Sequence, residues 1–176
     1  MKKSILVIAL AICSILITQA QPRAIGGRLG TNFEVSYQHD LSKSTFLQID
    51  AGTQYWFQGI QAEVTHNWIF ATPNWTPKGT WEWYAGVGIG GGYSWWGHHY
   101  YYSYYDNISS GYGFLGVTGM VGLSYTFWFP LQLSVDFRPT IGPKFGNFYS
   151  DRQGYHKVGF YANGLYDIAL SVRYKF

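Results

Sequence analysis

Residues 168–176 at the end of the chain constrain its fold more than any other stretch of the sequence. Every even-numbered position carries an apolar or aromatic side chain, and every odd-numbered position carries a small or charged one. A period of two predicts a β-strand with one apolar face and one polar face. The same alternation recurs along the chain, and a barrel that crosses a membrane turns the apolar face to lipid and the polar face inward. The pattern therefore favours a transmembrane β-barrel.

The first twenty residues have the pattern of a secretory signal peptide. Lys2 and Lys3 precede the apolar run 5–17, and the small-residue site 18–20 follows it. This order is typical of a cleaved signal, and the run is shorter than the roughly 20 residues of a membrane-spanning helix. We therefore expect cleavage before Gln21, leaving residues 21–176 as a single barrel domain.

The composition of the remaining chain fits that expectation. Cys13 is the one cysteine and would leave with the signal, so no disulfide can form. The remaining chain has ten basic and nine acidic residues, which is not the strongly basic charge of a nucleic-acid-binding protein. Charged residues make up 12% of the chain and aromatic residues 20%, against a usual charged share of about 25%. Without a helix-length apolar run, only a closed antiparallel up-and-down barrel crosses a bilayer.

Alternating segments recur with turn-like residues between them. They cover residues 47–55, 60–65, 81–89, 115–126 and 131–138, and the terminal segment completes the series. Counting the stretch 23–39 as one strand gives seven crossings, whereas a barrel with both ends in the periplasm needs an even number. A turn at Gly30–Asn32 restores parity, pairs Leu29 with Phe33 and sets Arg28 opposite Glu34. The predicted count is eight.

A rival topology keeps residues 23–39 whole and places a type I′ hairpin turn at Asn163–Gly164. That pairing would point Val158 and Phe160 inward and Lys157 toward lipid, so the alternation disfavours it. The eight-strand arrangement puts turns 40–44, 71–79 and 128–130 in the periplasm. It puts two long loops, 95–111 and 143–163, outside the cell, as such barrels usually do.

With these features, the sequence resembles the small OmpA/OmpX-like outer-membrane β-barrels of Gram-negative bacteria. The likeness rests on the signal peptide, the terminal strand 173–176 (RYKF), the runs 83–88 (WYAGVG) and 122–125 (GLSY), and the segment 130–139. The resemblance implies insertion in the cell outer membrane and contact with its lipid. It also implies that the barrel assembly machinery reads the strand ending at Phe176. Members share the barrel and differ in activity.

Charged residues fall on the predicted inner face. An eight-stranded barrel is just wide enough to be filled by side chains, and buried charges need partners. We therefore expect a sealed polar interior and negligible conductance, from a network comprising Arg28, Glu34, Asp50, Glu63, Glu82, Asp136, Arg138, Asp167, Arg173 and Lys175. A narrow ion channel along these residues is an alternative.

The loop 95–111 is the best candidate for contact with an extracellular glycan or protein, because tyrosine and tryptophan are favoured in binding surfaces. Its candidate contact residues are Trp95, Trp96, His98, His99, Tyr100, Tyr101, Tyr102, Tyr104 and Tyr105. Burial in the lipopolysaccharide layer is the alternative. Adjacent histidines point to opposite sides of an extended chain, so no metal site is expected. The run 86–91 matches G-x-G-x-x-G but lies inside a strand, so no cofactor is expected.

Catalysis on the outer leaflet is the competing function. Ser94, Ser103, His98 and His156 lack the spacing of a catalytic triad, and an acyl-binding barrel would need an apolar upper interior instead of a charged one. We therefore predict a monomeric, non-enzymatic barrel with a structural or surface-interaction role. A lipid-modifying enzyme and a narrow ion channel are its alternatives.

Overall fold

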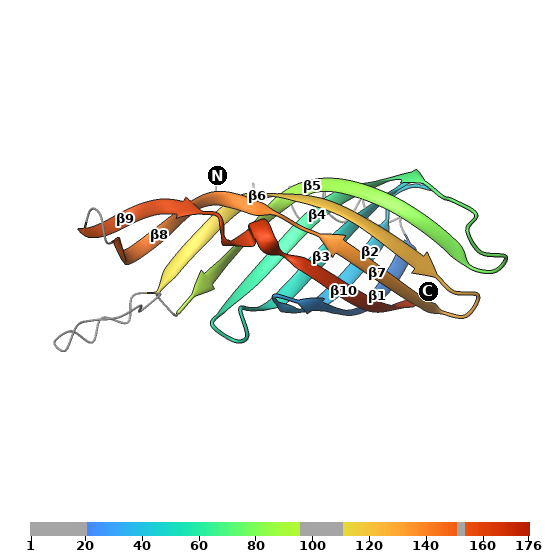
Figure 1. Cartoon of the computed structure of the whole chain (residues 1–176), viewed down its shortest axis with the longest axis horizontal. Helices are drawn as coiled ribbons and strands as arrows, with labels where there is room; N and C mark the ends of the chain where they lie inside the picture. The colour runs from blue at the N-terminus through green and yellow to red at the C-terminus, as the bar shows by residue number, and fades with distance from the viewer. Residues whose placement is uncertain (1–20, 96–110, 151–153) are drawn as a thin grey trace, which may run out of the picture.

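The protein is described by a computed structural model that covers residues 21–95, 111–150 and 154–176. The expected signal peptide and its cleavage site lie at or before the start of these ranges. The structure contains strands and one short 3₁₀ helix (Figure 1). Within the described residues, no helix has the length and apolar character needed to cross a membrane.

Strands follow one another along the chain in ten segments, which run antiparallel to their neighbours. They are β1 (Gln21–Gly30), β2 (Phe33–Asp40), β3 (Thr45–Gln54), β4 (Gly59–Ala71), β5 (Thr80–Ser94), β6 (Tyr112–Thr126), β7 (Leu131–Phe137), β8 (Thr140–Ser150), β9 (Gly154–Tyr161) and β10 (Ile168–Lys175). The 3₁₀ helix η1 (Asn163–Tyr166) separates β9 from β10.

The sheet closes into a barrel with eight strand positions, as the sequence predicts. Consecutive strands pair from β1 to β6, β6 pairs with both β7 and β8, and β10 joins β7 to β1. β7 and β8 together form one wall position, interrupted at Arg138 and Pro139. β9 and β10 likewise form one position, interrupted at η1.

The predicted turn at Gly30–Asn32 is confirmed. β1 and β2 form a hairpin there, with Leu29 paired to Phe33 and Arg28 to Glu34. The rival hairpin at Asn163–Gly164 is wrong, because η1 only interrupts a strand that keeps its direction. Val158 and Phe160 therefore stay on the outer face, where they are exposed.

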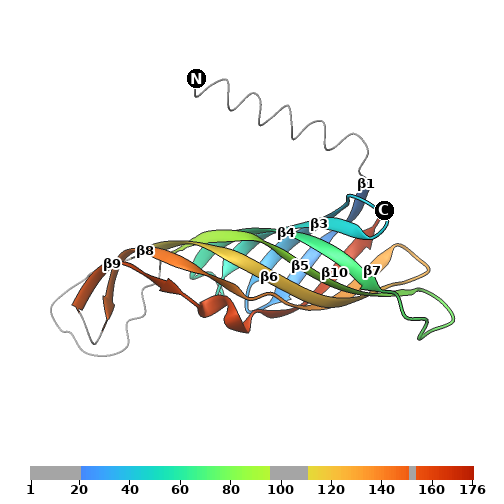
Figure 2. The same ribbon diagram turned by 90° about the horizontal axis from the view of Figure 1, so that it is seen from above.

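The prediction of a long loop over residues 143–163 is wrong. Most of it forms the outer part of β8 and all of β9, which pair as a hairpin over Gly142–Ser150 and Gly154–Tyr161. Figures 1 and 2 show this hairpin at the end of the barrel opposite the C-terminus. Gly142 and Pro143 disfavour a strand by propensity, but backbone pairing of β8 with β6 and β9 overrides them.

The register fixes the inclination of the strands. Following paired residues from Leu29 through β2, β3 and β4 reaches Tyr93 on β5. Following them the other way through β10, β7 and β6 reaches Trp83, ten residues earlier on the same strand. A shear of ten over eight strands corresponds to a tilt of roughly 40°.

Polarity is inverted relative to a soluble protein. On β10, the apolar side chains of Ile168, Leu170 and Val172 are exposed, whereas Ser171 and Arg173 are buried. The other strands repeat this division, so the core of the molecule is mostly polar. The turns 41–44, 72–79 and 127–130 lie at the same end of the barrel as the C-terminus (Figures 1 and 2).

Candidate functional site

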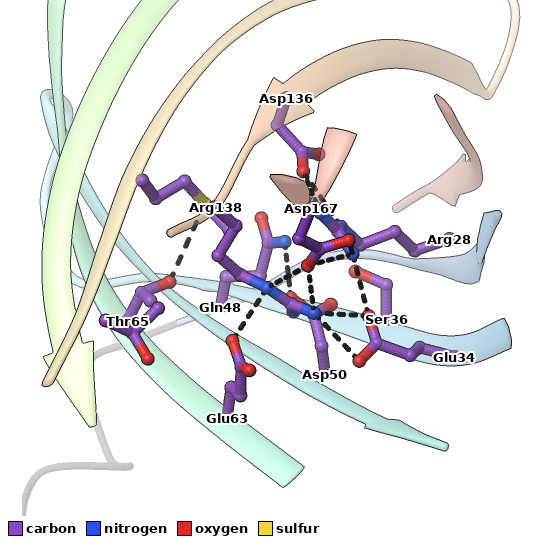
Figure 3. Close-up of polar contacts among 12 residues, drawn as sticks. Arg28, Glu34, Ser36, Gln48, Asp50, Glu63, Thr65, Asp136, Arg138 and Asp167 are labelled. Atoms are coloured by element: carbon purple, nitrogen blue, oxygen red, sulfur yellow. Dashed lines mark hydrogen bonds and ion pairs between the residues drawn. The ribbon is translucent and has the colours of Figure 1, made fainter. Parts of the chain in front are cut away.

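Arg138 lies at the centre of the barrel interior, at the interruption between β7 and β8. Its guanidinium pairs with Glu34 at 2.7 Å, Asp50 at 2.8 Å, Glu63 at 2.7 Å and Asp167 at 2.9 Å. These carboxylates come from β2, β3, β4 and the segment before β10, and they converge on one side chain (Figure 3). The Arg138 backbone N–H also donates to the Asp167 carbonyl oxygen at 2.8 Å, which ties the two interrupted strands together.

Arg28 supplies the second cation of this charged belt. It pairs with Asp136 at 2.7 Å, Glu34 at 3.0 Å and Asp167 at 3.0 Å. Its side chain and that of Arg138 are fully buried, as are the carboxylates within a few per cent. The belt thus brings together five carboxylates and two guanidiniums from distant strands, which cross-link the interior. Seven of the ten residues expected in the polar network lie here.

Arg173 lies in the interior but takes hydroxyl partners instead. It donates to Ser36 at 2.9 Å, Ser134 at 2.7 Å and Ser171 at 3.1 Å, and its side chain is fully buried. The sequence places Arg173 inside from its position on the odd face of β10. It does not indicate that the partners are serines.

Arg23 belongs to the interior although alternation did not select it. It pairs with Asp40 at 2.9 Å and also with Glu82, and its guanidinium lies 4.7 Å from the Phe46 ring centre. A β-bulge between Pro22 and Ala24 leaves Arg23 without a partner residue on β2 and breaks the period of two at that point. Glu82 therefore belongs to this second cluster. Lys175, also expected inside, is only half-buried at the same end.

Aromatic layers cover the charged belt at both ends. Phe46, Tyr84 and Met120 pack together on the side of the C-terminus. Tyr112, Phe114 and Tyr161 pack on the other side, where the Phe114 and Tyr161 rings stack at 3.9 Å. The interior at the end away from the C-terminus is therefore aromatic, whereas the sequence predicts a charged interior throughout. The inward parity of Phe46, Phe114 and Met120 was the signal that could have revealed the layers.

The β8–β9 hairpin presents an open strand edge at the end opposite the C-terminus. Among the described strands, β9 pairs only with β8. Val158 and Phe160 on this strand are 62% and 65% exposed. The sequence predicts a loop for residues 143–163, so it indicates neither the hairpin nor its open edge.

Most of the predicted contact loop lies outside the described residues. Of its candidate residues, only Trp95 is described, and it is exposed. In the part of the chain that the structure covers, no group of three or more His, Cys, Asp or Glu side chains could hold a metal ion.

The fold and interior define a closed eight-position antiparallel β-barrel with an apolar exterior and a cross-linked polar core. No protein-family model, curated protein or solved structure matches this chain.

Proposed function

We propose that this protein is an integral outer-membrane β-barrel with a sealed interior, and that its β8–β9 hairpin and outer loops contact partners at the cell surface. The observation that carries the proposal is the inverted polarity. Exposed apolar side chains surround the barrel, while arginines and carboxylates fill it. In water this exterior would be costly, whereas a bilayer satisfies it.

The height of the apolar band supports a transmembrane position. The outer row of β5 runs from Trp83 through the exposed Val87 and Ile89 to Tyr93. At a tilt of roughly 40°, each residue climbs about 2.5 Å, so these ten steps span about 25 Å. That height equals the apolar band of outer-membrane barrels, about 25 Å.

The packed interior supports a sealed barrel. Arg28 and Arg138 bridge strands across the lumen, and aromatic layers lie above and below them. Eight strands leave an interior that side chains fill. The proposed role is therefore structural and surface-directed instead of transport.

The β8–β9 hairpin supports the surface role. Tyr93 is in register with Gly113, then Phe145, then Val158. Each step to the next strand in this direction climbs about 3 Å, so Val158 lies about 9 Å beyond Tyr93. The open edge of β9 then lies outside the apolar band, where an extended segment of another protein can add to it.

Refolding into lipid vesicles tests the membrane proposal. Diluting urea-unfolded residues 21–176 into vesicles should give a protease-protected barrel. Val87→Arg, near the middle of the band, should lower its free energy of unfolding by about 2–4 kcal/mol. Ser42→Arg, in an exposed turn, is the matched control and should have little effect.

Equal effects of Val87→Arg and Ser42→Arg, or folding to the same state without lipid, would contradict the membrane position. The sealed interior has its own measurement. Purified barrel in planar bilayers should give no steady single-channel current, and reproducible steady currents would overturn that part of the proposal.

A further inference from the structure

An apolar groove lies on the outer face of the barrel. It has a volume of about 220 Å³ and runs across β5, β6, β7 and β10. Trp83, Leu123, Val135 and Ile168 are among the side chains that line it. These four side chains belong to outward-facing rows, so they open the groove to the surroundings of the barrel; the inward-facing Gly122 and Asp136 complete its floor.

A basic residue lies just below this groove. Tyr125 is the next outward residue after Leu123 on β6, and its hydroxyl donates to the Lys78 carbonyl oxygen at 2.9 Å. Lys78 is exposed in the turn between β4 and β5. Its ammonium lies 5.6 Å from the centre of the Trp128 ring, which belongs to the β6–β7 turn. The two turns are thus joined at the C-terminal end of the barrel.

Aromatic rings connect the groove to Lys78. The ring centre of Trp83, in the groove wall, lies 6.4 Å from that of Trp75, and the ring centre of Trp75 lies 5.3 Å from that of Trp81. The ring centres of Trp81 and Tyr125 in turn lie 4.6 Å apart. Tryptophan and tyrosine favour the headgroup level of a membrane, where one end of the ring meets water and the other meets lipid. The apolar groove therefore ends at a headgroup-level surface that carries a cation.

We propose that this surface is a binding site for one phospholipid of the periplasmic leaflet. An acyl chain occupies the groove, and the phosphate contacts the Lys78 ammonium beside Trp128. Charge complementarity and the continuity of groove, rings and lysine select this occupant. The inference rests on the proposed membrane position. It adds a specific lipid site to the general contact that any barrel makes with lipid.

Native mass spectrometry of the folded protein in mild detergent, titrated with dioleoylphosphatidylglycerol, tests the site. A juxtamembrane lysine contributes about 1 kcal/mol toward anionic lipid, so Lys78→Ala should weaken lipid retention about fivefold. Val135→Trp should fill the groove and also reduce retention. The matched controls are Lys43→Ala, in the β2–β3 turn, and Val35→Trp, on the outer face of β2. Both should retain lipid as the unmodified protein does.

Equal retention by Lys78→Ala and Lys43→Ala would overturn the proposal, as would equal retention by Val135→Trp and Val35→Trp. Titration with glycerophosphoglycerol, which has the headgroup without acyl chains, should give no retained adduct; full binding would contradict the role of the groove. Vesicle refolding separates the two proposals. If the chain does not insert, the membrane proposal is wrong. If it inserts but Lys78→Ala and Val135→Trp retain lipid as their controls do, only the proposed lipid site is wrong.

Discussion

At the scale of the residue, Arg138 binds strands that lie far apart in the sequence. Its guanidinium has five donors in a planar fork, which suits several carboxylates at once. Four carboxylates use it, while Arg28 contacts two of these four and also Asp136. The stability of the charged belt therefore depends mainly on Arg138, because most of its carboxylates share this one cation.

Arg138→Met should lower the free energy of unfolding of the vesicle-inserted barrel by about 3–5 kcal/mol, because it leaves buried carboxylates without their shared cation. Arg173→Met removes hydrogen bonds to three serines, and no carboxylate is among these partners. We therefore expect it to lower the free energy of unfolding by about 1–3 kcal/mol. Urea unfolding followed by tryptophan fluorescence measures both. If Arg138→Met costs no more than Arg173→Met, the buried carboxylates do not depend on Arg138.

Sequence reasoning at this scale succeeds where alternation is unbroken. Arg28 and Glu34 could be paired in advance because the turn at Gly30–Asn32 fixes their register. Arg23 could not be placed, since the bulge beside it changes parity and depends on the pairing of β1 with β2. The serine partners of Arg173 also escaped prediction, because alternation gives the face of a residue but not its neighbours across the lumen.

At the scale of the element, β1 shows how tightly neighbouring strands approach. A Cβ atom added to Gly26 would overlap the carbonyl oxygen of Val172 on β10. One added to the next residue, Gly27, would lie 4.0 Å from the Glu34 carbonyl oxygen, which is an ordinary van der Waals contact. A side chain larger than hydrogen is therefore excluded at Gly26 but fits at the adjacent Gly27.

Gly26→Ala should destabilise the barrel by about 1–3 kcal/mol through overpacking against backbone, which cannot rotate away. Gly27→Ala should change stability by no more than about 0.5 kcal/mol. The pair is compared by urea unfolding in the same vesicles. Equal costs for the two variants would show that the strand spacing around Gly26 is wrong.

The β8–β9 hairpin marks the limit of prediction for elements. Its outward alternation continues through Ile141, Phe145, Val158 and Phe160, so the pattern was present. One proline, Pro143, and several glycines interrupt it, and local propensity favours a loop. Pairing with β6 along Tyr112–Thr118 extends the wall, and a register between distant segments is not contained in either sequence alone.

At the scale of the whole molecule, the structure has an axial order. A charged belt lies between two aromatic layers, an apolar band surrounds them, and the β8–β9 hairpin extends past one end. The turns at the other end carry Lys78 and its tryptophans. We propose that this axis crosses the outer membrane with the hairpin outside the cell.

Cysteine labelling on intact cells measures this orientation. In a Cys13→Ala background, Val158→Cys on β9 and Ser42→Cys in the β2–β3 turn are each expressed in a Gram-negative host. A membrane-impermeant maleimide should label Val158→Cys on intact cells and Ser42→Cys only after the outer membrane is disrupted. Labelling of Ser42→Cys on intact cells, with Val158→Cys protected until disruption, would contradict the proposed orientation.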